Sequence, residues 1–234
     1  MNYCKTLILT FITFISFLKC DTVYRVPIQS TIDLGLPNYI QRSIEEAVND
    51  SANAIIFDLN TFGGRVDGAT QIKDEILNSP ILTVAFINKR AISAGALISL
   101  SCDKIYMTSG ATIGAATAVD MSGSKGSEKV ISYMREEMAS TAESNGRNSE
   151  IARGMVDEDL YFEYLFINGD SIFVDDIEGR KEGKLISLTT NQAIKYSIAD
   201  GKAETFQDVL EQINLENSRS EERRVGKECR SRWS

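Results

Sequence analysis

Short apolar runs alternate with segments of helical spacing along most of this chain. The runs NAIIFDLN and PILTVAFIN fit buried strands, and the segments before and after the first of them repeat apolar residues every three or four positions, as at Ile40, Ile44 and Ala47. Strands that alternate with amphipathic helices are typical of parallel sheets with right-handed crossovers. The pattern therefore predicts an α/β layered fold built on a parallel sheet.

The second half of the pattern predicts two further features. A small, polar loop over residues 120–128 leads into a long helix with Ile131, Met134 and Met138 on one face. Beyond residue 160, strand-like runs flank the turn NGD and predict a hairpin, and Thr189 with Gln192 forms a capping box that opens a short helix. A last helix is expected over FQDVLEQINL.

Both ends of the chain differ from the rest. Residues 1–20 carry an uncharged apolar run too short to span a bilayer, which predicts a signal peptide, with a membrane anchor or a buried helix as alternatives. Residues 219–234 are Arg-rich and aperiodic and look like a translated sequencing adapter, so we expect them not to belong to the fold; a genuine basic tail is the alternative. The expected domain is residues 21–218, and the natural chain is expected to continue past Ser218.

Composition excludes several kinds of function. The net charge is −8, and because residues 1–20 and 219–234 carry two and three net positive charges, residues 21–218 carry −13, which argues against nucleic acid as a partner. The chain has no histidine, and Cys102 is the one cysteine inside the expected domain. We therefore expect no disulfide framework, no zinc site and no cofactor.

The stretch KRAISAGALISLSCDKI places Ser93 where a strand meets a short apolar helix. Ser93 is a candidate nucleophile, although serine is also a preferred helix N-cap, and on spacing alone the cap is favoured. If Ser93 is a nucleophile, the N–H of Ala94 and one from Gly63 or Gly64 are candidates for an oxyanion hole. For the two glycines, a tight turn is the competing explanation.

Without histidine, the base for a catalytic serine has to be another residue. A lysine is neutral near pH 7 only if burial or nearby positive charge lowers its pKa. Lys129 stands in the first turn of its predicted helix, where the helix dipole disfavours a cation, and Lys125 is the reserve candidate. An ordinary surface role is the alternative for both.

A second glycine-bearing segment, TSGATIGAA, contains Thr112, Ile113 and Gly114. These residues could line a peptide groove or pack closely against neighbouring backbone.

These motifs together resemble the NfeD family of membrane-bound serine proteases, which share a fold with Clp protease, signal-peptide-peptidase A and the crotonases. The similarity runs from IIFDLNTFGG through RAISAGALIS to EKVISYMREEM and GKLISLTTNQAIKYSIADG, and so covers nearly all of residues 22–214. The resemblance implies a ClpP/crotonase-like layered fold with repeated β-β-α and βα units. It also implies Ser93 as nucleophile, Lys129 as base, and backbone N–H groups around Gly64 and Ala94 as the oxyanion hole. One departure is Phe62, where the family usually has proline.

The resemblance also implies a function. We expect an exported, membrane-associated endopeptidase with its protease domain on the periplasmic side, which forms a homo-oligomer, a dimer or larger, and cleaves apolar segments of stomatin-like membrane proteins. One alternative is a non-catalytic scaffold for such a partner. A crotonase-like acyl-CoA enzyme is a weaker alternative, because a signal peptide and the small-residue serine helix argue against it.

Overall fold

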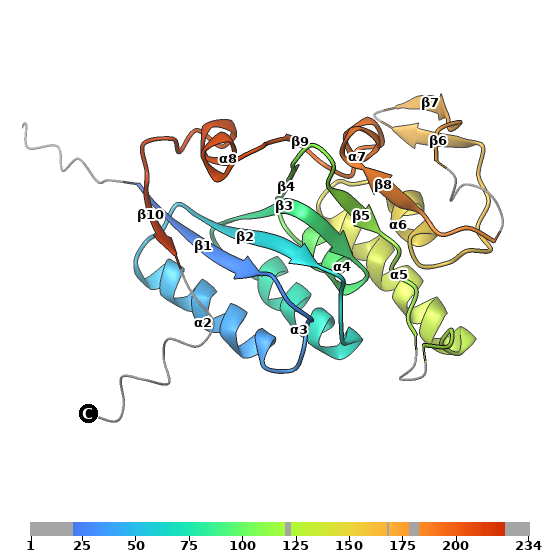
Figure 1. The fold of residues 1–234 in the computed structure, drawn as a ribbon, viewed down its shortest axis with the longest axis horizontal. Coiled ribbons are helices and arrows are strands. Elements are labelled where there is room, and N and C mark those ends of the chain that lie inside the picture. Colours follow the sequence, from blue (N-terminus) through green and yellow to red (C-terminus); the bar gives the residue numbers. More distant parts are fainter. Residues whose placement is uncertain (1–20, 120–122, 168, 178–182, 223–234) are drawn as a thin grey trace, which may run out of the picture.

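A sheet of eight strands forms the centre of the described chain (Figure 1). The structure is a computed structural model that describes residues 21–119, 123–167, 169–177 and 183–222. The sheet strands are β1 (Thr22–Ile28), β2 (Ala54–Thr61), β3 (Leu82–Ile92), β4 (Lys104–Met107), β5 (Thr112–Gly114), β8 (Ser187–Thr189), β9 (Gly201–Lys202) and β10 (Arg219–Glu222). The hydrogen-bonded order is β10-β1-β2-β3-β4-β9, and β5 joins the last residues of β3 and carries β8 on its other edge. Every pair is parallel except β5 with β8, so the predicted α/β fold with a parallel sheet is confirmed.

Helices connect these strands, and a separate hairpin lies beyond the sheet. The helices are α2 (Leu36–Asn49), α3 (Val66–Leu77), α4 (Ala94–Leu100), α5 (Glu128–Ser144), α6 (Ser149–Gly154), α7 (Thr190–Lys195) and α8 (Phe206–Gln212). The hairpin consists of β6 (Tyr164–Ile167) and β7 (Asp170–Phe173), as the NGD turn predicts. The predicted capping box at Thr189 and Gln192 is also present and opens α7.

The two faces of the sheet belong to different hydrophobic clusters. Along β2, Ile55 and Phe57 pack into the larger cluster, and Ala54 and Ile56, which point to the opposite face, pack into the smaller one. Helices α2, α3, α4 and α5 supply the larger cluster, and Figure 1 shows α2 and α3 side by side beneath the sheet. Helix α8 covers the other face with its buried Val209 and Leu210. Because β2 and β3 are parallel, their carboxyl ends lie at the same end of the sheet, where the Gly-Gly turn and Ser93 follow them.

The structure bears on the expected ends of the domain in one place. Residues 1–20 and 223–234 lie outside the described residues, whereas Arg219–Glu222 forms β10 beside β1. The sheet thus extends four residues into the segment that was expected not to belong to the fold. In the described part of the chain, none of the helices combines the length and hydrophobicity needed to cross a bilayer.

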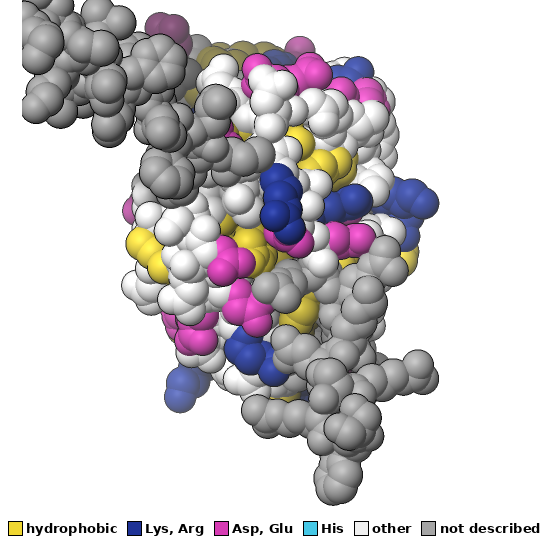
Figure 2. All heavy atoms as spheres, turned by 90° about the vertical axis from the view of Figure 1, so that its left-hand side faces the viewer, with side chains coloured by type: hydrophobic (Ala, Val, Ile, Leu, Met, Phe, Trp, Pro, Cys, Tyr) yellow, Lys and Arg dark blue, Asp and Glu magenta, His cyan; other side chains and the backbone are white. Residues whose placement is uncertain are grey.

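Acidic and basic side chains are interspersed over the face of the molecule that lies on the left in Figure 1, as Figure 2 shows. Several of the ion pairs are partly buried. In one of them, Arg25 of β1 bonds the fully buried Asp58 of β2 and also stacks on Phe206 of α8. Charged side chains therefore help to hold α8 on the sheet.

Candidate active site

Ser93 occupies a strained turn between β3 and α4. Its backbone has φ 56° and ψ −121°, a region that a residue with a Cβ enters at a cost of about 1–3 kcal/mol. The Ser93 N–H donates to the carbonyl of Gly114 (2.9 Å), and the Ser93 carbonyl accepts from the N–H of Ala96 (2.8 Å). Ser93 is the N-cap of α4, as predicted, but its side chain makes no capping hydrogen bond. The Ser93 hydroxyl therefore does not cap the helix, which is the role that spacing alone favours.

The Gly63–Gly64 turn packs directly against Ser93. Gly63 has φ 101°, and a Cβ there would lie 2.6 Å from Cβ and 3.1 Å from Oγ of Ser93. A Cβ on Gly64 would lie 2.1 Å from the carbonyl oxygen of Ile32. Both glycines are thus required because the backbones approach too closely for a side chain. The structure brings together these two parts of the predicted site, which lie about 30 residues apart in the sequence.

Two of the three predicted oxyanion donors have unpaired N–H groups. The Gly63 N–H donates to Oγ1 of Thr61 (3.0 Å), so in this structure it is already paired. Within the described residues, the N–H groups of Gly64 and Ala94 have no acceptor. The carbonyl of the Gly63–Gly64 peptide accepts from Ile32 N–H (3.0 Å), and because carbonyl and N–H point to opposite sides of a trans peptide, the Gly64 N–H points away from Ile32.

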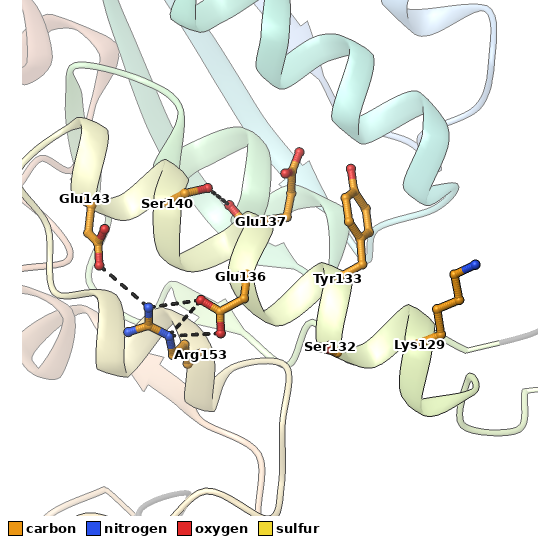
Figure 3. Close-up of a pocket in the computed structure, with 8 residues that line it drawn as sticks. All are labelled: Lys129, Ser132, Tyr133, Glu136, Glu137, Ser140, Glu143 and Arg153. Carbon is orange, nitrogen blue, oxygen red and sulfur yellow. Dashed lines mark hydrogen bonds and ion pairs between the residues drawn. The ribbon is translucent and has the colours of Figure 1, made fainter.

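Lys129 lies in the first turn of α5, as predicted, and its side chain is exposed. Figure 3 shows its ammonium group pointing away from the ion pairs that Arg153 of α6 makes with Glu136 and Glu143. Within the described residues Lys129 has no ion pair, and no hydrogen bond joins it to Ser93. The structure therefore places the lysine at the start of the helix but not within hydrogen-bonding distance of the serine.

Lys125, the reserve candidate, has a different environment. Its ammonium group pairs with Glu158 (2.9 Å), and this hydrogen bond raises the pKa of Lys125. A general base needs a lowered pKa, so the observed pairing opposes that role.

A groove of about 920 Å³ lies between the start of α3 and α5. Gly64 lines it from one side and Tyr133 from the other, and Tyr133 is one helical turn from Lys129 on the same face of α5. The full lining is Thr31, Gly64, Arg65, Val66, Asp67, Thr70, Gln71, Val119 and Tyr133. Ser93 lies beside this lining, against Gly63, and not in it. The groove thus connects the glycine turn with the lysine-bearing face of α5.

The segment Thr112–Gly114 has a structural position that favours close packing over groove lining. It forms β5, whose two edges are both paired, with β3 and with β8. Gly114 has φ 131°, and a Cβ there would lie 2.4 Å from the carbonyl oxygen of Ile186. These residues are absent from the lining of the groove, and Gly114 instead holds the backbone of Ser93.

Phe62, which stands where the NfeD family usually has proline, points outward from the turn. Its side chain is 74% exposed, and the guanidinium of Arg90 stacks over its ring at 4.4 Å. The adjacent Gly63 still reaches Ser93, so the turn keeps its close approach with phenylalanine in place of proline.

Sequence reasoning missed several residues that shape this site. Tyr133, Arg90 and Thr61 acquire their roles only through contacts between distant segments, although Thr61 lies just two residues before Gly63.

Cys102 is buried, which raises the pKa of its thiol and makes it a poor nucleophile. No cluster of metal-binding side chains occurs among the residues described.

The fold described above places the chain among the ClpP-like α/β proteins. The layered α/β fold is that of the ClpP-like proteins: ClpP1 from Listeria monocytogenes superposes with a TM-score of 0.54 at 18% identity, over 77% of this chain and 91% of that one. A family model described as NfeD1b, N-terminal domain, matches residues 22–223. The chain therefore belongs to the NfeD1b N-terminal domain family.

Similar proteins include two curated membrane proteins. The chain is 33% identical over 198 residues to membrane protein NfeD1b of Bacillus subtilis, covering 85% of this chain and 42% of that protein. It is 28% identical over 202 residues to membrane-bound protease PH1510 of Pyrococcus horikoshii, covering 83% and 40%. The chain thus spans about two fifths of the length of these relatives.

The similar solved structures include the N-terminal part of that protease. The 1510-N membrane-bound stomatin-specific protease, solved as a lysine-to-alanine mutant in complex with a substrate peptide, superposes with a TM-score of 0.73 at 24% identity, over 90% of this chain and 95% of that one. At that identity the superposition establishes the fold alone.

Proposed function

We propose that this domain is a serine endopeptidase in which Ser93 is the nucleophile and Lys129 the general base. The observation that carries the proposal is the strained turn at Ser93, whose hydroxyl makes no capping bond and lies against Gly63. A strained residue persists only where the surrounding fold holds it in place, and such residues cluster at functional sites. Similarity to a membrane-bound protease supports the same reaction class.

The reaction follows from the groups present. Ser93 Oγ attacks the peptide carbonyl carbon while its proton passes to the neutral amine of Lys129, and the carbonyl oxygen takes up the negative charge. The N–H groups of Gly64 and Ala94 donate to that oxygen. Collapse of the tetrahedral intermediate breaks the C–N bond, and the leaving amine takes the proton from Lys129. Water then attacks the acyl-enzyme, gives its proton to Lys129, and releases the acid as Ser93 regains its hydrogen.

Support for Lys129 comes from its position in the first turn of α5 and from its lack of an acidic partner in the described chain. Because its side chain is exposed and makes no hydrogen bond to Ser93, catalysis requires the lysine side chain or the start of α5 to approach the serine when a peptide is bound. Loose apo geometry of this kind is common among catalytic groups.

The relatives support a proposal for the substrate and the location. We propose apolar segments of stomatin-like membrane proteins as substrates, since the 1510-N protease is described as stomatin-specific. Membrane association is proposed from the two curated membrane proteins. Export, a periplasmic protease domain and a homo-oligomer remain proposals from the family resemblance.

A fluorophosphonate probe tests the nucleophile directly. We expect the full chain to be labelled and the Ser93→Ala variant to lose labelling. Ser51→Ala is the matched control, because Ser51 also has a positive φ (54°) but follows the end of α2. Labelling should persist in this control.

Two results would count against an endopeptidase. An intact wild-type chain that is not labelled would favour a scaffold that organises a stomatin-like partner. Saturable binding of an acyl-CoA, with no labelling, would favour the crotonase-like alternative.

A further inference from the structure

Thr61, the last residue of β2, contacts Gly63 and lies close to Gly95, the residues next to the two proposed oxyanion donors Gly64 and Ala94. We propose that Thr61 is the positioning residue that fixes the Gly63–Gly64 turn relative to the serine helix α4. This inference rests on the proposed function, since it concerns the same site. Its evidence is the pair of contacts made by the two branches of one buried side chain, which is 2% exposed.

The hydroxyl branch holds the turn. Thr61 Oγ1 donates to the carbonyl of Ser30 (2.7 Å) and accepts from the N–H of Gly63 (3.0 Å). A hydroxyl has a single hydrogen to donate, so the longer contact of Oγ1 with the Gly63 carbonyl (3.4 Å) is secondary. The peptide before Gly63 is therefore fixed to the loop after β1.

The methyl branch holds the serine helix. A Cβ on Gly95 would lie 2.6 Å from Cγ2 of Thr61, so the methyl group occupies the space that a larger residue would need in the first turn of α4. Thr61 also pairs in register with Ala91 of β3, two residues before Ser93. One side chain thus sets the separation between the turn that carries the Gly64 N–H and the helix that carries the Ala94 N–H.

Such a fixed separation matters for catalysis. Oxyanion donors act when they lie 2.7–3.1 Å from the developing charge, and a turn with two adjacent glycines has unusual backbone freedom. Loss of the Oγ1 bonds leaves the Gly63 N–H without its acceptor, so the turn is held only from the side of Ile32, and its first peptide can shift. The donors then misalign in the transition state, while binding of the probe or substrate changes little.

The experiment compares three substitutions in the full chain with a rhodamine-linked fluorophosphonate as probe. Thr61→Val keeps the branched shape and removes Oγ1, and Thr61→Ser keeps Oγ1 and removes the methyl. Thr83→Val is the matched control: buried Thr83 also donates to an oxygen (Asp103 Oδ2, 2.7 Å) and accepts from a backbone N–H (Asp103, 3.0 Å), but it lies near the start of β3, away from Ser93. The maximal inactivation rate and the half-saturating probe concentration are measured for each variant at a temperature where circular dichroism shows it folded.

We expect Thr61→Val to lower the maximal inactivation rate by about 10- to 100-fold, less than deletion of a donor, with the half-saturating concentration within about twofold. Thr61→Ser keeps the Oγ1 bonds and loses only the methyl contact with α4, so it should lower the rate by about 3- to 10-fold, less than Thr61→Val. Thr83→Val should stay within about twofold of wild type. Wild-type reactivity of Thr61→Val, an equal loss in Thr83→Val, or a loss in Thr61→Ser as large as in Thr61→Val would each overturn the inference.

A replacement variant and the labelling of the wild-type chain cover the two ways in which the experiment could be ambiguous. If Thr61→Val does not fold, Thr61→Cys replaces it, and because a thiol is a weak donor and acceptor, its rate should fall below that of Thr61→Ser. A wild-type chain that is not labelled at all contradicts the proposed function, whereas a labelled wild type with an unaffected Thr61→Val contradicts only the role of Thr61.

Discussion

Ser93 differs from the other serines with positive φ in its position, because it opens a helix and they follow one. Three non-glycine residues with positive φ, Ser51, Ser197 and Asn214, each directly follow the C-cap of a helix, where left-handed residues commonly end helices. Ser93 opens a helix and Ala115 follows β5, whose Gly114 bonds Ser93. Helix termination therefore explains the first three but not the strain at Ser93, which is better explained by presentation of its hydroxyl.

Gly63 offers a test of this close packing at the residue scale. Gly63→Ala should lower the free energy of unfolding by about 3 kcal/mol and abolish fluorophosphonate labelling, because the new methyl meets Ser93 and the backbone has a positive φ. Gly110→Ala is the control, since Gly110 has φ 91° with no atom within 4 Å of its missing Cβ. It should cost about 1 kcal/mol and leave labelling intact.

Urea unfolding and labelling of the two variants give the answer together. If Gly63→Ala is no less stable than Gly110→Ala, or is labelled like wild type, the Gly63 backbone does not approach Ser93 as described.

At the scale of elements, α5 links the groove to the rest of the fold. Lys73 of α3 pairs with Glu137 of α5 (2.8 Å), and both side chains are largely buried, at 13% and 14% exposure. Arg153 of α6 pairs with Glu136 on the opposite side (Figure 3). Both ties lie in the third turn of α5. The first turn, which carries Lys129, has no ion pair among the described residues.

The role of Lys129 can be tested by removing its amine while keeping the helix. Lys129→Met should reduce the labelling rate by about 10²- to 10⁴-fold, the contribution typical of a general base, and methionine has a similar helix propensity. Lys125→Met should stay within about twofold, because Lys125 is paired with Glu158. The rates are measured with the same probe. A loss confined to Lys125→Met would assign the base to the reserve lysine instead.

The sequence predicts the elements with clear periodicity and misses those without it. The strands around Ile55 and Val84 and helices α2, α3 and α5 follow from apolar spacing. Helix α6 has six residues and β5 three, too short for a period to appear, and β10 contains no apolar residue. Likewise, the position of Ser93 at a strand–helix junction is predictable from local sequence, whereas its φ and its contact with Gly63 depend on how β2 and β3 pair.

At the scale of the whole molecule, the buried Arg147 joins three distant segments. Its guanidinium donates to the carbonyls of Cys102 and Asp103 before β4, to that of Ile198 after α7, and to the carboxylate of Asp200 (3.0 Å). Asp200 also accepts from the Ile105 N–H at the sheet edge. Arg147 and Asp200 therefore connect the segment after α5 to β4 and to the segment that leads into β9.

Asp200 makes this connection sensitive to acid. Burial alone would raise the pKa of Asp200, but the charge of Arg147 and the bonds from Ile105 and Lys104 outweigh it, so the pKa is lowered in the folded state. The unfolded chain then binds the proton more readily, and the stabilisation is complete above the unfolded pKa of about 3.9 and is lost as the pH falls through the folded pKa. Unfolding by urea should thus become easier between pH 5 and pH 3, roughly the window set by that value.

Asp200→Asn separates this contribution from general acid denaturation. The variant should lose about 1–3 kcal/mol at pH 7, because Arg147 keeps its carbonyl partners but loses its carboxylate. It should lose less further stability than wild type on acidification, since the titrating group is gone. Glu45→Gln, on the exposed side of α2, should reproduce the wild-type pH dependence. An unchanged acid slope in Asp200→Asn would mean that other carboxylates control the acid stability of the sheet edge.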